Sequence, residues 1–94
     1  MLVARLNDAC SGNCRFHGKQ DGIIVEASSD ITVNGLGVAR VGDKVQANCG
    51  HFGVISDNGF NVKANNKSIA RKGDSTEGDF IAQITGSSTD VNVG

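Results

Sequence analysis

The chain has 94 residues, and its nine basic and ten acidic side chains leave a net charge of −1. This balance argues against binding to nucleic acid or docking to an anionic membrane, which both rely on basic patches. No apolar run approaches the roughly 20 residues that span a bilayer, and the start lacks the apolar region of a signal peptide. Only 38 % of the residues are apolar. We therefore expect one small domain with a thin core, held together with help from a metal, a disulfide or a partner protein.

A six-residue string that recurs three times divides the chain into repeats. It reads VARLND at residues 3–8, VARVGD at 38–43 and IARKGD at 69–74. Three matches at a near-constant spacing indicate an internally repeated architecture. The single domain, residues 1–94, is thus predicted to consist of repeats at 3–37, 38–68 and 69–94.

Each repeat is predicted to run from its Arg/Asp turn through a polar loop to two short strands. In chain order the first strands are GIIVEA, GVISD and FIAQIT, and the second strands are DITVNG, NVKANN and TDVNVG. The pairs Asn34-Gly35 and Asn65-Asn66, which end the second strand in the first two repeats, tolerate the positive φ of a tight turn. Thirteen Gly, no Pro and no helical apolar period complete the pattern of an all-β chain.

Three strand-turn-strand units, each too small to fold alone, predict a small cone or pyramid with pseudo-threefold symmetry. A linear solenoid is the alternative arrangement, but its two ends would need caps. Threefold closure leaves fewer exposed strand edges. We therefore favour packing of the three repeats around a common axis.

The repeated Arg and Asp are interpreted as structural turn residues. A Gly or Asn before each Asp is typical of a turn in which the carboxylate accepts hydrogen bonds from nearby backbone N–H groups. The Arg is within reach of the Asp of its own or a neighbouring repeat, whereas a catalytic role would need three equivalent sites or one asymmetric site. The residues are Arg5, Asp8, Arg40, Asp43, Arg71 and Asp74.

All three Cys and both His residues lie in the two loops that follow the first two Arg/Asp turns, DACSGNCRFHG and DKVQANCGHFG. A rotation that relates the repeats brings these loops together at one end of the axis. Cys14, His17, Cys49 and His51 then form a Cys₂His₂ set that suits tetrahedral Zn²⁺, with iron as the alternative metal. Cys10 is an alternate ligand, which ranks lower because the second loop has no counterpart for it.

A disulfide is the competing interpretation of the same cysteines. Cys10 with Cys14, or Cys14 with Cys49, can bridge outside the cytosol, although the odd count of three leaves one thiol unpaired. The chain is then a disulfide-held binding module with solvated histidines. A further alternative is a small zinc or redox enzyme with Cys10 or Cys14 as nucleophile and His17 as base. Neither alternative accounts for the triple repeat.

The segment VNGLGVARVGD at residues 33–43, together with ARLND, ARKGD and NCGH, resembles PAAR-repeat proteins, and the resemblance covers essentially the whole chain. The sequence departs from the family pattern at three points. No Pro precedes Ala-Arg, STEGD replaces a third-repeat Ser-Cys-Gly, and Asn7 stands where Gly is usual. The resemblance implies a pyramid with a metal, usually zinc, near its apex and a base that caps a trimeric β-helical spike. Such a tip performs no catalysis, takes no small-molecule substrate and contacts an outer membrane only transiently, while the spike pierces it.

The resemblance also implies a location and a partner-binding face. The spike belongs to a phage tail baseplate or to a type VI secretion system, and because no toxin or adaptor segment is fused to the 94 residues, we expect a virion tail spike tip. The alternative is a bacterial cytoplasmic protein that the secretion system delivers. The residues expected to face the spike, or else to fill the protein's own core, are Ile31, Val33, Val62, Val91 and Val93.

Overall fold

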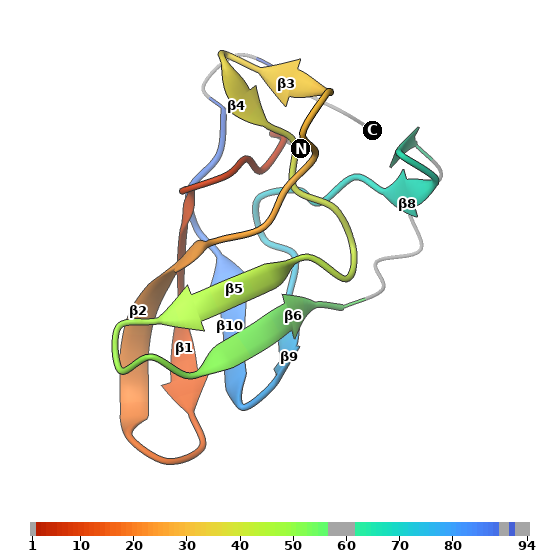
Figure 1. Ribbon diagram of the computed structural model, residues 1–94. Helices are drawn as coiled ribbons and strands as arrows, with labels where there is room; N and C mark the ends of the chain where they lie inside the picture. Colours follow the sequence, from red (N-terminus) through yellow and green to blue (C-terminus); the bar gives the residue numbers. More distant parts are fainter. Residues whose placement is uncertain (1, 57–61, 89–90, 92–94) are drawn as a thin grey trace.

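Ten short strands, and no helix, form the described part of the chain, which comprises residues 2–56, 62–88 and 91 of a computed structural model (Figure 1). The expectation of an all-β fold is confirmed. Among these residues there is no helix of the length and apolar character that crossing a membrane requires. The strands are β1 (Ala9–Cys14), β2 (Gly18–Ile24), β3 (Thr32–Val33), β4 (Leu36–Gly37), β5 (Lys44–Ala47), β6 (Phe52–Ile55), β7 (Lys63–Ala64), β8 (Lys67–Ser68), β9 (Thr76–Gly78) and β10 (Phe80–Ile84).

Six of the strands form one antiparallel sheet in the order β10-β1-β2-β5-β6-β9. A bridge between Ser75 and Gln83 joins the two ends of this order, so the sheet nearly closes into a barrel. The other four strands form two separate hairpins, β3–β4 and β7–β8. Figure 1 shows these hairpins at one end of the molecule, which we call the base. The turns at residues 15–17 and 48–51 lie at the opposite end, which we call the apex.

The segments predicted to be polar loops are in large part strands, which corrects the sequence interpretation. β1, β5 and β9 begin within two residues of the turn Asp, and β1 pairs with β2 as β5 pairs with β6. Their inward side chains at equivalent positions are Cys10, Val45 and Thr76, all buried. Because Ser, Asn and Gln occupy much of the rest, the apolar alternation that identifies a half-buried strand is weak here.

The three repeats meet in a closed ring of backbone hydrogen bonds. The N–H of Ala4 donates to the carbonyl of Ala70 at 3.0 Å, that of Ala39 to Ala4 at 3.0 Å, and that of Ala70 to Ala39 at 2.9 Å. All three alanines are completely buried, and their small side chains allow the three segments to approach closely. The ring places the repeats in equivalent positions around one axis, which confirms the predicted pseudo-threefold arrangement.

Two apolar clusters are built on this ring. The larger cluster contains the ring alanines and is filled by Phe80 and by one isoleucine from each repeat. The smaller cluster contains Val3, Val38 and Ile69, which immediately precede the alanines, together with Ala64 of β7. Neighbouring side chains of an extended segment point to opposite sides, so the larger cluster fills the barrel and the smaller one fills the base.

Each turn Asp pairs with the Arg three residues before it. In the second repeat, the backbone N–H, Nε and Nη2 of Arg40 donate to the carboxylate of Asp43 at 2.9, 2.9 and 3.0 Å. The first and third repeats contain the same ion pair, at 3.1 and 3.5 Å. The residue before each Asp has a positive φ, of 72° at Asn7, 90° at Gly42 and 94° at Gly73. Asn tolerates this conformation better than other residues with a side chain, which explains how Asn7 replaces Gly.

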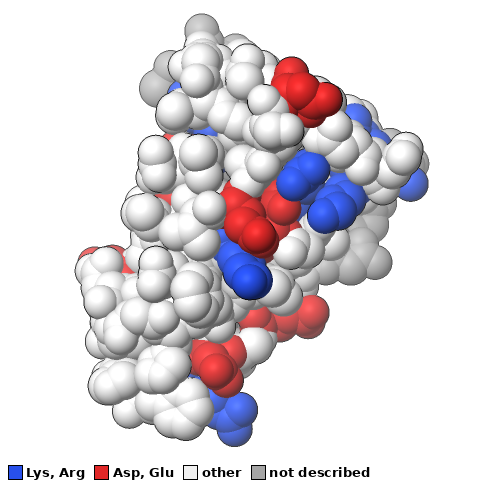
Figure 2. All heavy atoms as spheres, in the orientation of Figure 1, with Lys and Arg blue, Asp and Glu red and all other residues white. Residues whose placement is uncertain are grey.

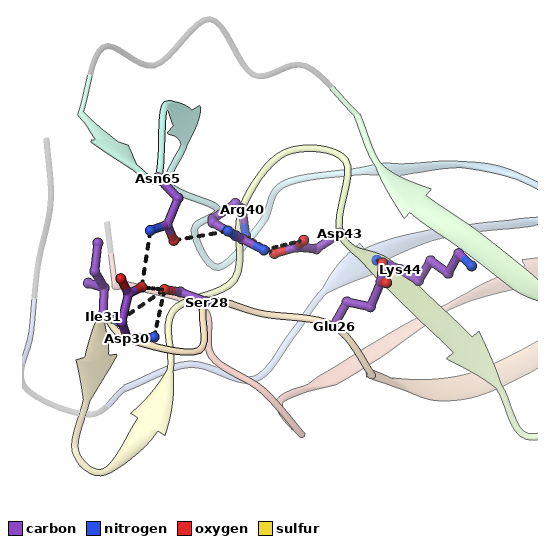
Figure 3. Close-up of polar contacts among 8 residues, drawn as sticks. All are labelled: Glu26, Ser28, Asp30, Ile31, Arg40, Asp43, Lys44 and Asn65. Atoms are coloured by element: carbon purple, nitrogen blue, oxygen red, sulfur yellow. Dashed lines mark hydrogen bonds and ion pairs between the residues drawn. The ribbon is translucent and has the colours of Figure 1, made fainter.

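An asparagine from each base hairpin joins these ion pairs. Asn65 accepts a hydrogen bond from Nη1 of Arg40 at 2.9 Å and donates to Asp30 at 3.0 Å (Figure 3). Asn34 accepts a hydrogen bond from Nη1 of Arg5 at 3.3 Å. Both asparagines have a positive φ, 54° at Asn65 and 53° at Asn34, as the tight-turn prediction requires. The hairpins are thereby fixed to the ring, and acidic and basic side chains lie next to one another on the face drawn in Figure 2.

Candidate metal centre

Two turns at the apex carry four side chains that the sequence interpretation singled out. Cys14 is the last residue of β1 and His17 lies in the turn that leads to β2, whereas Cys49 and His51 lie in the turn between β5 and β6. β2 and β5 are paired, and the N–H of Asn48 donates to the carbonyl of a β2 residue at 2.8 Å. Pairing of these middle strands therefore places the two turns side by side.

The four side chains converge on one point. Their ligand atoms, one sulfur or ring nitrogen from each of Cys14, His17, Cys49 and His51, all lie within 4.8 Å of one another. The Sγ of Cys14 is 3.2 Å from Nδ1 of His51 and 3.7 Å from Nδ1 of His17, and the Sγ of Cys49 is 3.6 Å from Nδ1 of His51.

Three of the separations between donor atoms are close to those around a tetrahedral metal ion. An ion bound at about 2.3 Å to sulfur and about 2.0–2.1 Å to nitrogen holds its donor atoms roughly 3.3–3.8 Å apart. The three measured separations, 3.2, 3.6 and 3.7 Å, lie within or close to this range. A set of two thiols and two imidazoles is also a common donor set of structural zinc sites. The group is therefore able to hold a metal ion, and bound metal would link the two turns.

The electrostatic surroundings of Cys14 favour the thiolate that a metal binds. Burial opposes ionisation of this thiol, but hydrogen bonds from the backbone N–H groups of Phe16 and His17 and from the side chains of His17 and Cys49 outweigh it. Together they lower the pKa of Cys14 to about 6. The hydrogen bonds thus favour the thiolate of Cys14 although the residue is only 2 % exposed.

The third repeat contacts the centre, and none of its described residues belongs to the four-residue group. The side chain of Arg15 forms an ion pair with the carboxylate of Asp79 at 3.6 Å, and the backbone N–H of Arg15 donates to the backbone carbonyl of Asp79 at 2.9 Å. The ring of Phe16 lies 4.7 Å from the ring of His51, which in turn stacks on His17 at 5.1 Å. The sequence interpretation did not assign a role to Phe16, although its position between a Cys and a His in the loop was a usable signal.

Cys10 lies outside the four-residue group. It is 1 % exposed and belongs to the larger apolar cluster, at the position that Val45 and Thr76 occupy in the other repeats. Burial, and then the negative charge of Asp21, raise the pKa of its thiol to about 11. The structure thus places this alternate ligand in the core, where it is a small apolar side chain. All three cysteines are free thiols.

Four of the five predicted partner-facing residues are described by the structure, and these four lie at the base. The carbonyls of Ile31, Val62 and Val91 accept hydrogen bonds from Val38, Ile69 and Val3, at 2.9, 2.9 and 3.0 Å, so these three residues are equivalent under the pseudo-threefold rotation. The exposed fractions of Ile31 and Val62 are 39 % and 44 %. Val33 and Val91 are half-buried against the smaller apolar cluster, and Val93 lies outside the described residues.

Comparison with known proteins gives one family match. The family model of the PAAR motif matches residues 17–82, which is most of the chain. No curated protein matches the sequence.

Proposed function

This chain belongs to the PAAR motif family, and from that we propose that it is the tip of a membrane-piercing spike. The PAAR motif is known from spike-tip proteins of contractile injection systems, and the family is structural rather than catalytic. In this proposal the chain caps and sharpens the end of a trimeric β-helical spike and performs no bond chemistry. The machine is a phage tail baseplate, where the chain is part of the virion, or a type VI secretion system that carries it out of the bacterial cytoplasm.

The observation that carries this proposal is the closed ring of Ala4, Ala39 and Ala70. It gives a single polypeptide a nearly threefold base, and three equivalent apolar residues, Ile31, Val62 and Val91, surround that base. A trimer ends in three equivalent strand edges, which attract further strands unless they are covered. A base with the same symmetry matches such an end with one chain per trimer.

The metal in this proposal is zinc, and its role is mechanical. The Cys₂His₂ donor set and its separations suit tetrahedral zinc. The apex contains few buried apolar side chains, so a metal that links residues 15–17 to residues 48–51 would give it rigidity that packing does not supply. Elemental analysis of the tag-free protein is expected to find about one zinc per chain, lost in Cys14→Ala and kept in Cys10→Ala.

Binding to a spike tests the proposed role. The chain is mixed with a trimeric β-helical spike protein from a contractile machine of the same source, and the mass of the complex is measured by light scattering after gel filtration. We expect one chain per trimer. The double variant Ile31→Asp, Val62→Asp places two charges on exposed positions of the base and should abolish binding.

Phe16→Ser is the matched control, because Phe16 is also exposed, at 60 %, but lies at the apex. It should bind as the unmodified chain does, and circular dichroism should show that all variants fold. Three chains per trimer, or equal binding by the base variant, would contradict the proposal. Zinc content is measured separately, so loss of the metal centre and loss of spike binding can be told apart.

A further inference from the structure

We propose that Cys14 and Cys49 form a redox pair, which a two-electron oxidant converts into a disulfide that replaces the metal as the link between the apical turns. This inference goes beyond the proposed function. It rests on the four-residue group at the apex and on the separation of that group from Cys10.

The geometry brings the two sulfurs close enough to react after a local shift. Both lie beside Nδ1 of His51, at 3.2 Å for Cys14 and 3.6 Å for Cys49, and within 4.8 Å of each other. A disulfide needs about 2.05 Å between sulfurs, so they must approach by at most about 2.7 Å. Cys49 lies in a turn beside Gly50, whose φ is 99°, and a turn can shift more easily than the paired strand that ends at Cys14.

Accessibility selects the first reacting cysteine, and proximity to it selects the second. Cys49 is half-buried and is therefore the sulfur that an oxidant reaches first. Cys14 is the only other cysteine in the converging group. Cys10 is outside that group and packs inside the apolar cluster of the barrel, away from the sulfur of Cys49 that an oxidant reaches. Cys10 should therefore remain reduced while the pair is oxidised.

With hydrogen peroxide as the oxidant, the reaction balances in two steps. The thiolate of Cys49 attacks one peroxide oxygen, the O–O bond breaks, and the departing hydroxide takes a proton to become water, which leaves a sulfenic acid on Cys49. The thiolate of Cys14 then attacks that sulfur, the S–S bond forms, the S–O bond breaks, and the second hydroxide is protonated to water. The two sulfurs together lose two electrons and peroxide gains two.

The consequence is an exchange of one cross-link for another. After oxidation only His17 and His51 remain as donors, which is too few for a closed tetrahedral site. The disulfide then joins the end of β1, next to the turn at residues 15–17, covalently to the turn at residues 48–51. If the chain is a spike tip, as proposed above, it moves from a reducing cytoplasm into oxidising surroundings, and its apex stays tied in both.

The experiment uses the full chain, reduced and supplied with one equivalent of zinc, and titrates it with hydrogen peroxide. Released zinc is measured with a chromogenic chelator, free thiols by titration, and linkages by peptide mapping. We expect one zinc released for every two thiols lost, a linked peptide that joins Cys14 to Cys49, and Cys10 as the remaining thiol. Dithiothreitol with added zinc should reverse all three changes.

Two variants make the outcome decisive. Cys10→Ala should form the same link and release the same zinc, whereas Cys49→Ser should form no link between the turns. A link from Cys10 to Cys14, sulfinic acid on Cys49 in place of a disulfide, or zinc retained after both thiols are lost would overturn the proposal. If the chain binds no zinc, the proposed metal centre fails, but the peptide map still decides whether Cys14 and Cys49 are the redox pair.

Discussion

Replacement of Asp43 by Ala is the sharpest test of the repeated Arg/Asp turn. Asp43 is 2 % exposed, and its carboxylate accepts three hydrogen bonds from Arg40, two of them from the guanidinium. The substitution removes all three bonds and leaves a cation whose side chain is only 14 % exposed. Both effects destabilise the folded state.

The magnitude follows from the burial of this pair. Removal of one partner from a buried ion pair costs about 3–5 kcal/mol. Arg40 keeps its hydrogen bond to Asn65 and some contact with water, so we expect the lower end, about 3 kcal/mol. A domain of this size is stabilised by roughly 5–14 kcal/mol in total. At about 4–8 °C per kcal/mol, the melting temperature should fall by roughly 12–24 °C.

The assay is thermal and urea unfolding followed by circular dichroism, with zinc in excess. Asp79→Ala is the matched control, because its ion pair with Arg15 is exposed, 67 % for Arg15 and 46 % for Asp79, and exposed pairs contribute about 0–1 kcal/mol. Asp43→Asn keeps one acceptor oxygen, so its loss of stability should lie between those of Asp43→Ala and Asp79→Ala. This variant replaces Asp43→Ala in the test if the Ala variant does not fold. A loss below about 1 kcal/mol for Asp43→Ala would refute the view that these pairs hold the turns.

Three further predictions concern the ring, the metal and the base. Ala39→Leu overfills the completely buried ring and should cost about 1–3 kcal/mol or more in urea unfolding; the same change at exposed Ala9 should be nearly neutral, and equal costs would contradict the packing argument. Because the pKa of Cys14 is lowered to about 6, its thiolate persists above that pH and is lost below it. The apparent zinc affinity in a chelator competition should therefore fall at least tenfold per pH unit below pH 6, where the proton on Cys14 must be displaced as well, and a flat profile between pH 5 and 6 would refute this. Asn65→Gly and Asn65→Val both remove the two side-chain hydrogen bonds of Asn65, but only Val adds about 1–2 kcal/mol of strain at its positive φ of 54°. Asn65→Gly should therefore cost less in thermal unfolding, and the reverse order would contradict the view that the turn requires a positive φ here.

The sequence by itself determined the repeats, their symmetry and the tight turns. A motif that recurs at a near-constant spacing folds into equivalent environments, so VARLND, VARVGD and IARKGD were sufficient to predict threefold packing. The turns at Asn34-Gly35 and Asn65-Asn66 were predictable because few other residues tolerate a positive φ. The convergence of four Cys and His residues followed from the same symmetry.

Only the tertiary structure decided which residues in the first polar segment are strand, core or apex. Cys10 and Cys14 are four residues apart in β1 and, because side chains alternate along a strand, lie on the same face. Sequence spacing therefore cannot tell them apart. Their surroundings can: Cys10 packs against the core that all three repeats fill, and Cys14 reaches the strand end where the second repeat brings His51. Those contacts come from strands that are distant in sequence, and their positions are fixed by strand pairing and closure of the ring.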